Sequence, residues 1–353
     1  MSIFGLLDIL TIILLVLYLW GLRPSLSNSA ANNYLAKDKM LALKGIVVII
    51  PIIVHLLNMG VYGGPIINFL SRYGEFLTNL FFMISGYGLT KQHLIKENYA
   101  KGFLLHRFSK ILIPYIIATF LYVVANFVFN GFLYWPSDII LAILRGDPVA
   151  MYSWYVIHTI LFYLWFYFMM RICGKRKNLL IVGGLLYYIV TTCAFMALGY
   201  GMHWWGSSLG IIAGIIFGSY EEQIFKFFYK NFYLKLLALL AVGAVIFCVE
   251  NALHRIYWID EHFPTHTVFD LFISIFLFIS LVGFEVGNPV SRFLGKYSYE
   301  IYILQGLFIL AGRSAKMHLD GNMYIMFALV GSIVSGIALF YVDKFILSKL
   351  IRK

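Results

Sequence analysis

The chain has 353 residues, of which 61% are hydrophobic and 12% are charged. Soluble domains have about 45–50% apolar and about 25% charged residues, so this composition excludes a soluble enzyme and a disordered chain. The net charge of +11 does not indicate nucleic-acid binding, because the basic residues form no soluble patch. The three cysteines, Cys173, Cys193 and Cys248, lie far apart, which excludes a disulfide scaffold and a zinc site. We therefore predict an integral membrane protein without a bound metal.

Long apolar runs divide the chain into eleven candidate membrane helices, because a helix needs about 20 apolar residues to cross a bilayer. The runs are continuous and lack the two-residue alternation of β-barrel strands. No Lys or Arg precedes the first run and no clear cleavage site is present, so we expect an uncleaved helix rather than a signal peptide. The expected fold class is all-α, a polytopic bundle of about 11 transmembrane helices. The segments are residues 3–20, 42–58, 74–90, 109–131, 150–171, 179–198, 205–219, 234–250, 267–284, 298–313 and 323–346.

The distribution of basic residues predicts the orientation of these helices. When the connections are assigned alternately to two sides, 22 of the 27 Lys and Arg residues fall on one side. Basic residues gather on the cytoplasmic side of a membrane protein. We therefore expect the N-terminus outside and the C-terminus in the cytoplasm.

Two basic or titratable residues share one face of the second predicted helix. Lys44 precedes His55 by eleven positions, which is three helical turns plus about 20° and a rise of about 16 Å. An ionisable side chain inside a span is a functional candidate, and this pair could hold the two ends of one long substrate. Alternatively, the lysine reaches the membrane surface and the histidine bonds a neighbouring helix.

A second candidate lies at the start of the fourth helix, where Arg107 and Lys110 are three residues apart and could clamp phosphates. Taken alone, these residues are explained more simply as ordinary cytoplasmic charge. Earlier in the chain, Ser85, Gly86, Tyr87 and Gly88 form a small-residue segment that permits close helix packing.

Polar and aromatic residues also mark the fifth and tenth helices. Trp154 and His158 are one turn apart near the predicted outer end of the fifth helix, where an interfacial role is the alternative. Glu300, Tyr302 and Gln305 are polar residues at the start of the tenth helix. No phosphate-binding loop, serine-hydrolase elbow or zinc-protease motif occurs in a usable context, which argues against an ATP-driven pump and against those hydrolases.

Taken together, these blocks resemble the acyltransferase 3 family of membrane acyltransferases in order and spacing, over roughly residues 37–345. The matching blocks are Asp38–His55, Phe81–Leu89, Arg107-Phe108-Ser109-Lys110 with Ile113-Pro114-Tyr115, Ser153-Trp154-Tyr155 and Ser298–Gln305. The resemblance implies a ten-helix domain over residues 31–353, with residues 1–30 as an additional N-terminal helix and linker.

The resemblance also implies roles for individual residues. His55 corresponds to the essential histidine of a motif with a basic residue, ten spacers and a histidine, and Lys44 supplies the basic residue. Arg107 and Lys110 match the family's pair of arginines, and Ser85, Gly86 and Tyr87 match its serine-glycine-aromatic block. The expected acyl-CoA-binding residues are Lys44, Ser85, Tyr87, Arg107 and Lys110, and the expected acceptor-binding residues are Trp154, His158, Tyr302 and Gln305. At Gln305 many relatives have a histidine, so an acid–base role cannot be transferred to this amide.

The expected activity is O-acylation of a cell-surface or lipid-linked glycan, with acyl-CoA, most simply acetyl-CoA, as the donor substrate. His55 would act as general base, since an imidazole exchanges a proton near neutral pH. We expect no permanently bound cofactor, a bacterial plasma-membrane location, and contact with membrane lipid; a separate partner protein is an open question. The alternatives are a non-enzymatic glycan or lipid carrier or flippase, and an acyltransferase of the same fold with a non-glycan acceptor.

Overall fold

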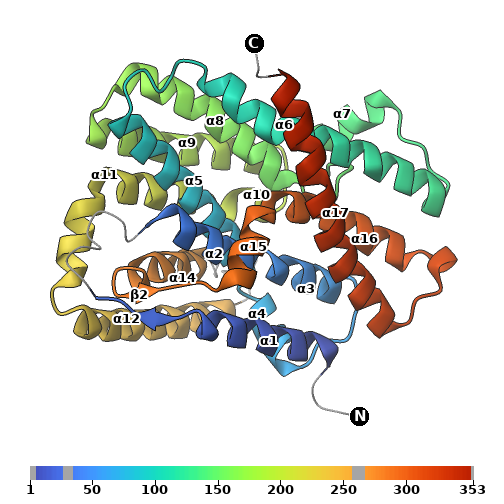
Figure 1. Cartoon of the computed structure of the whole chain (residues 1–353), viewed down its shortest axis with the longest axis horizontal. Helices are drawn as coiled ribbons and strands as arrows, with labels where there is room; N and C mark the ends of the chain where they lie inside the picture. Colours follow the sequence, from blue (N-terminus) through green and yellow to red (C-terminus); the bar gives the residue numbers. More distant parts are fainter. Residues whose placement is uncertain (1–4, 27–34, 257–266, 351–353) are drawn as a thin grey trace.

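The structure is a computed structural model that describes residues 5–26, 35–256 and 267–350 (Figure 1). It is all-α, as predicted, apart from a two-residue antiparallel pair in which β1 (Arg23–Pro24) lies beside β2 (Phe284–Glu285). The α-helices are α1 (Leu6–Trp20), α2 (Lys37–Val47), α3 (Ile49–Asn58), α4 (Pro65–Ser71), α5 (Glu75–Ile95), α6 (Phe103–Ala125), α7 (Pro136–Leu144), α8 (Trp154–Cys173), α9 (Lys177–Ala197), α10 (His203–Gly206), α11 (Leu209–Tyr229), α12 (Phe232–His254), α14 (Thr267–Ser280), α15 (Pro289–Lys296), α16 (Ser298–Arg313) and α17 (Gly321–Leu350). A π-helical turn, η2 (Asn126–Asn130), extends α6, and a 3₁₀ turn, η3 (Ala315–Met317), follows α16.

Each predicted membrane segment coincides with a helix or with two consecutive helices. Within the described ranges, six helices are long and apolar enough to cross a membrane: Lys37–Asn58, Phe103–Asn130, Trp154–Cys173, Lys177–Ala197, Phe232–His254 and Gly321–Leu350. Helices α1 and α14 are apolar but shorter, with 15 and 14 residues. Helices α5, α11 and α16 fall outside the six: α16 has only 16 residues, and α5 and α11 include charged and polar residues, mostly in their C-terminal parts. The structure thus supports a membrane protein, while the number of eleven spans stays a prediction.

The second predicted helix is divided into α2 and α3 at Val48. Pro51 explains the division, because its ring has no N–H to donate to Val47 and would clash with that carbonyl in a regular helix. The two parts still form one 22-residue apolar segment. This segment contributes the side chains of both Lys44 and His55 to the interior of the bundle.

Small residues bring α5 and α11 together in the most extensive helix contact of the described chain. Gly210, Gly214 and Gly218 recur every fourth position on α11. A Cβ atom at Gly214 would lie 2.2 Å from the Met83 carbonyl oxygen, so only glycine permits this approach. Gly86 is the matching residue on α5, with a virtual Cβ 2.5 Å from the Ile211 carbonyl oxygen. The predicted packing role of the segment from Ser85 to Gly88 is therefore filled by Gly86.

Buried acidic residues inside predicted spans have a structural role at the ends of neighbouring helices. Asp8 accepts a hydrogen bond from the Ile67 backbone amide at the start of α4, at 2.9 Å, and Glu250 accepts one from Phe269 at the start of α14, at 3.0 Å. The Asp270 carboxylate interacts with the backbone of Phe76, at the start of α5. The first amides of a helix have no intrahelical acceptor, and a carboxylate satisfies them favourably.

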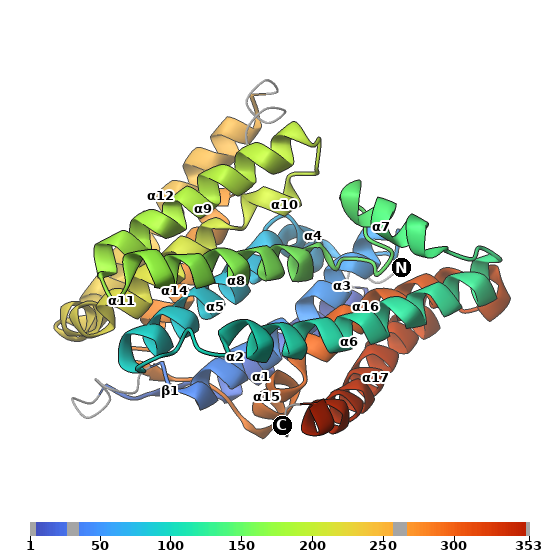
Figure 2. The ribbon, with the colours of Figure 1, turned by 90° about the horizontal axis from the view of Figure 1, so that it is seen from above.

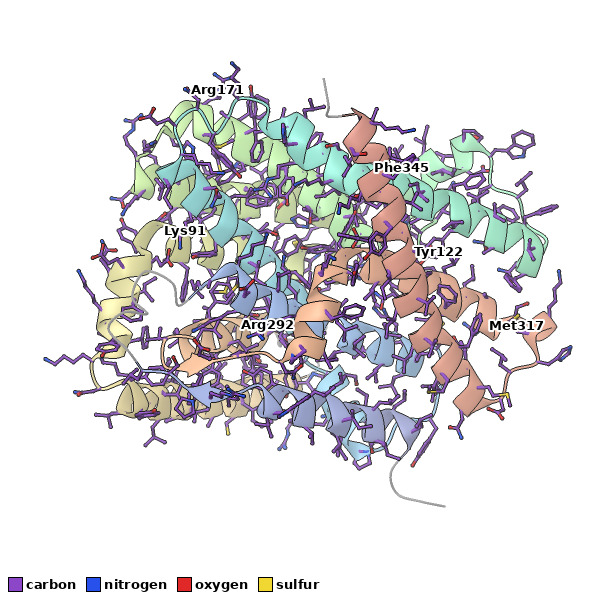
Figure 3. All side chains as sticks on the ribbon, viewed as in Figure 1. Lys91, Tyr122, Arg171, Arg292, Met317 and Phe345 are labelled. Atoms are coloured by element: carbon purple, nitrogen blue, oxygen red, sulfur yellow. The ribbon has the colours of Figure 1, made fainter. Side chains whose placement is uncertain are left out.

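The helices form two groups around a central layer, which is visible from above in Figure 2. Helices α8, α9, α11 and α12 lie on one side, α6, α16 and α17 lie on the other, and α3 and α5 lie between them. In Figure 3, Lys91 and Arg171 lie toward the opposite end of the long axis from Met317. The first two belong to predicted cytoplasmic connections and Met317 to a predicted outer one. The side on which each terminus lies stays a prediction.

Candidate functional site

The described residues of the bundle line a Lys110, a His55 and an Arg107 cavity, each named after one residue of its wall. The Arg107 cavity has a volume of about 410 Å³, the Lys110 cavity about 580 Å³ and the His55 cavity about 500 Å³. Each is large enough for part of a drug-sized ligand. Together they contain most of the side chains that the sequence singled out.

Shared walls arrange the three cavities in a series. Lys44, Ser85 and Tyr163 belong to both the Arg107 and the Lys110 cavity. Pro51, Leu77, Thr78 and Tyr302 belong to both the Lys110 and the His55 cavity. The cavities therefore abut one another, and the face of α2 and α3 that carries Lys44, Pro51 and His55 runs along all three.

His55 lies on α3, where its ring stacks on that of Tyr152 with centroids 3.4 Å apart and an interplanar angle of 4°. Its Nδ1 atom is buried and has no hydrogen-bond partner within the described residues. Since the side chain lines the His55 cavity, the other ring nitrogen, Nε2, is the one that can face a ligand. The stack fixes the plane of the imidazole in the wall of the cavity.

Tyr152 was not singled out from the sequence. It occupies the turn before α8 with φ of 64°, a left-handed conformation that is costly for a bulky residue. Tyr302 stabilises the turn, because its hydroxyl donates to the Tyr152 carbonyl oxygen at 2.7 Å. The Tyr152 hydroxyl is itself buried and unpaired among the described residues. A single sequence carries no signal for a positive φ at tyrosine, which explains why Tyr152 was not predicted as a site residue.

Gln305 is fully buried on α16 and interacts with the His55 side chain. Neither its amide nitrogen nor its amide oxygen has a hydrogen bond of normal geometry to the described residues. A buried unpaired amide costs free energy, about 1–3 kcal/mol for each group left without a partner. His55 Nδ1, the Tyr152 hydroxyl and the Gln305 amide thus leave several buried polar atoms unsatisfied next to one cavity.

The Arg107 cavity is strongly basic. Its described wall contains Lys37, Lys44, Lys91 and Arg107 and no carboxylate. Arg107 donates to the Tyr99 hydroxyl at 2.6 Å and lies over the Tyr163 ring, 6.0 Å from its centroid. The charge of Arg107 also acts on Lys44 across the cavity. Such a cluster of cations suits a polyanionic ligand.

Lys110 lies in a different cavity from Arg107, although the two are only three residues apart on α6. The Lys110 cavity also contains Lys296 and Lys344, which sequence reasoning missed because they belong to other helices. Glu300 and Asp343 face these lysines from α16 and α17. The expected clamp of Arg107 with Lys110 is therefore replaced by two separate basic sites that share Lys44.

The segment after Phe82 divides its side chains between packing and cavity walls. Ser85 faces both the Arg107 and the Lys110 cavity. Tyr87 is buried, and its hydroxyl donates to Glu221 at 3.0 Å and accepts from Lys91 at 2.9 Å. Lys91 completes this network with an ion pair to Glu221 of 2.8 Å. Tyr87 thus lines the Arg107 cavity while its hydroxyl holds α5 against α11.

The structure separates Trp154 from His158. Trp154 lines the His55 cavity, with its ring 5.4 Å from that of His203. His158 has no exposed surface, its Nδ1 atom lies 2.9 Å from the Trp204 carbonyl oxygen, and its ring packs against Phe82 and Phe195. His158 therefore belongs to the core of the bundle rather than to the surface that an acceptor would meet.

The charge of the His55 cavity differs from that of the other two. Its wall contains Arg72 and the three carboxylates Glu75, Asp147 and Asp270. Burial lowers the pKa of the His203 imidazole, and the nearby Asp147 carboxylate only partly opposes this. The formal charge of the cavity walls thus changes from positive at Arg107 to negative at His55.

Comparison with known families assigns the chain. A family model described as an acyltransferase domain, that of the acyltransferase 3 family, matches residues 39–342. The chain belongs to this acyltransferase family. Neither the curated proteins nor the solved structures contain a match to it. In this membrane acyltransferase the matched range includes the whole wall of the His55 cavity, whereas α1 lies before it.

The family match confirms the resemblance on which the sequence prediction rested. The assigned class is a membrane acyltransferase; the donor, the acceptor and the role of each residue belong to the proposal below. Among the described residues, no group of three or more His, Cys, Asp and Glu side chains is placed to hold a metal ion.

Proposed function

We propose that this acyltransferase moves an acyl group, most simply acetyl, from cytoplasmic acyl-CoA to a hydroxyl of a cell-surface or lipid-linked glycan. The observation that carries the proposal is the series of cavities from Arg107 to His55. A basic cavity at one end suits the phosphates of CoA, and the adjoining Lys110 cavity suits its extended arm. The opposite cavity, which contains Trp154, suits a sugar, because aromatic faces pack on the apolar faces of sugar rings.

His55 lies where the two substrates would meet. We place the thioester at the shared wall formed by Pro51, Thr78 and Tyr302, with the acceptor hydroxyl in the His55 cavity. In this proposal Nε2 of His55 takes the hydroxyl proton as the oxygen attacks the thioester carbonyl carbon. The C–S bond then breaks, and the imidazolium returns the proton to the departing thiolate, which leaves as CoA. The overall change is one ester formed and one thioester broken.

Gln305 and Tyr152 would prepare His55 for this step. A lone pair on Nε2 requires the hydrogen on Nδ1, and the Gln305 amide oxygen is the neighbouring acceptor that would favour this tautomer. Catalytic hydrogen bonds often shorten only when substrate binds, which fits the unpaired state of both groups here. The Tyr152 ring would keep the imidazole from turning away.

The first experiment replaces His55 with Ala and measures acetyl esters on the surface glycans of the producing cells by proton NMR. We expect ester signals to disappear while the protein remains in the membrane. His106→Ala is the matched control, because His106 is exposed and bonds only the local Gly102 carbonyl. Ester content that survives His55→Ala would exclude His55 as the base.

The second experiment separates an acyltransferase from a carrier, since a carrier has no need of CoA. Radiolabelled acetyl-CoA should bind the purified protein, and Arg107→Ala should weaken binding by at least about tenfold. Arg171→Ala is a closely matched control: Arg171 also bonds a tyrosine hydroxyl, that of Tyr167, and lies over its ring, but at the exposed end of α8. Absence of acetyl-CoA binding to the unmodified protein would favour the carrier.

A further inference from the structure

The His55 cavity carries an excess of negative charge that the described protein does not neutralise. One arginine, Arg72, faces Glu75, Asp147 and Asp270 in its wall. The ion pairs found among the described residues are Lys39 with Glu285, Lys91 with Glu221, and Lys226 with Glu222. None of these reaches the cavity. Among residues 5–26, 35–256 and 267–350, no cation therefore lies within ion-pair distance of its carboxylates.

Two of these carboxylates act on each other across the interface of α5 and α14. Glu75 begins α5, and Asp270, which is 1% exposed, lies in the first turn of α14 and interacts electrostatically with Glu75. The Asp270 carboxylate interacts with the Phe76 backbone, but the Asp270 Oδ1 atom has no hydrogen-bond partner among the described residues. Like charges placed close together at low dielectric are unfavourable unless a cation or a proton joins them.

The unpaired hydroxyl of a neutral residue, Thr267, also indicates a ligand site in this wall. Thr267 is 6% exposed, lines the cavity, and its hydroxyl has no hydrogen bond within the described residues. A methyl group at Gly206 would lie 2.8 Å from Glu75 Oε2 and 3.4 Å from Thr267 Oγ1, so both oxygens border the space beside this glycine. Buried hydroxyls are normally paired, and this one has an acceptor lone pair available for a donor.

We propose that Glu75, Asp270 and Thr267 form a subsite for a protonated amine of the acceptor, so that the acceptor is an amino sugar or a glycan carrying an aminoalkyl group. An ammonium group has three donors and no acceptor, which matches two carboxylate oxygens and one hydroxyl oxygen. Trp154 in the same wall supplies an aromatic face for the sugar ring. The inference rests on the proposed function, because it takes the His55 cavity as the acceptor site.

The test measures the binding of two probe sugars, one cationic and one neutral, to the purified protein by saturation-transfer NMR. The probes are methyl glucosaminide, buffered below the pKa of its amine, and its N-acetyl counterpart, which has no charge. We expect the amine to bind at least about tenfold more tightly. Glu75→Gln should abolish the preference, and Glu222→Gln should keep it, because Glu222 lies at the exposed end of α11 and pairs with Lys226.

Equal binding of the two sugars to the unmodified protein, or an undiminished preference in Glu75→Gln, would overturn the inference. Thr267→Val, which removes only the hydroxyl, gives the answer if Glu75→Gln does not fold, and it should weaken the preference. His55→Ala should retain the preference, since the subsite does not include His55. The two proposals can therefore be rejected independently. If the protein prefers the amine but transfers no acyl group, only the proposed function is rejected. If it transfers an acyl group but shows no preference for the amine, only the amine subsite is rejected.

Discussion

His55 and Tyr152 stack almost parallel at 3.4 Å, and they come from segments nearly one hundred positions apart. Tyr152 reaches this position only because its backbone adopts a left-handed conformation. Strained residues persist where the surrounding structure holds them, and here the Tyr302 hydroxyl bonds the strained residue's carbonyl. We interpret the stack as the element that orients the proposed base.

The stack predicts different results for two substitutions of Tyr152. Tyr152→Phe keeps the aromatic face and removes only an unpaired hydroxyl, so acyl transfer should stay within about threefold of the unmodified rate. Tyr152→Leu removes the flat face, and the turnover number should fall about 10–100-fold because the base is misplaced, with little change in KM. Steady-state kinetics with acetyl-CoA would measure both. Equal rates for the Phe and Leu variants would show that the stack does not orient His55.

Replacing Gln305 should change stability and activity in opposite directions. Gln305→Leu removes a buried amide without a described partner, so unfolding in detergent should require about 1 kcal/mol more. The same change removes the acceptor for Nδ1–H, and transfer should fall by about 10²-fold. Gln305→Glu keeps an acceptor oxygen and should retain more transfer than Gln305→Leu. A Gln305→Leu protein with full activity would remove Gln305 from the proposed mechanism.

The two glycines of the small-residue segment should respond differently to alanine. At Gly86 a Cβ would lie 2.5 Å from the Ile211 carbonyl oxygen, whereas at Gly88 it would meet nothing within 4 Å. Gly86→Ala should therefore destabilise the protein by about 1–3 kcal/mol. Gly88→Ala should be neutral or stabilise it by up to about 1 kcal/mol, since alanine favours a helix. Thermal unfolding of the two variants in one detergent would compare them, and similar losses would contradict the packing described for α5 and α11.

Two ion pairs of different burial provide a further matched test. Lys91→Ala leaves Glu221, whose side chain is 15% exposed, with only the Tyr87 hydroxyl, and should cost about 1–3 kcal/mol of stability. Lys226→Ala breaks the ion pair between Lys226 and Glu222, whose side chains are 70% and 66% exposed, respectively. This substitution should cause no measurable change in stability. Chemical unfolding at two salt concentrations would distinguish them, because screening affects the exposed pair more. A loss at Lys226 as large as that at Lys91 would contradict this.

The sequence by itself determined the class of protein and the positions of its long helices, whereas the short helices α4, α7 and α15 were not predicted. The length of each apolar run and the helical period are local properties, so the eleven segments and the shared face of Lys44 and His55 follow without knowledge of packing. The order of the motif blocks likewise identified the acyltransferase family, which the family match confirmed.

Only the tertiary structure decided which side chains meet. It separated Arg107 from Lys110, placed His158 in the core, and brought Tyr152 onto His55. It also explained Asp8 as a cap for a helix that lies 59 positions further along the chain. The physical reason is that contacts between helices depend on where small residues allow close approach and on which buried polar groups find a partner. Both are properties of pairs of segments, and a single run of sequence contains only one member of each pair.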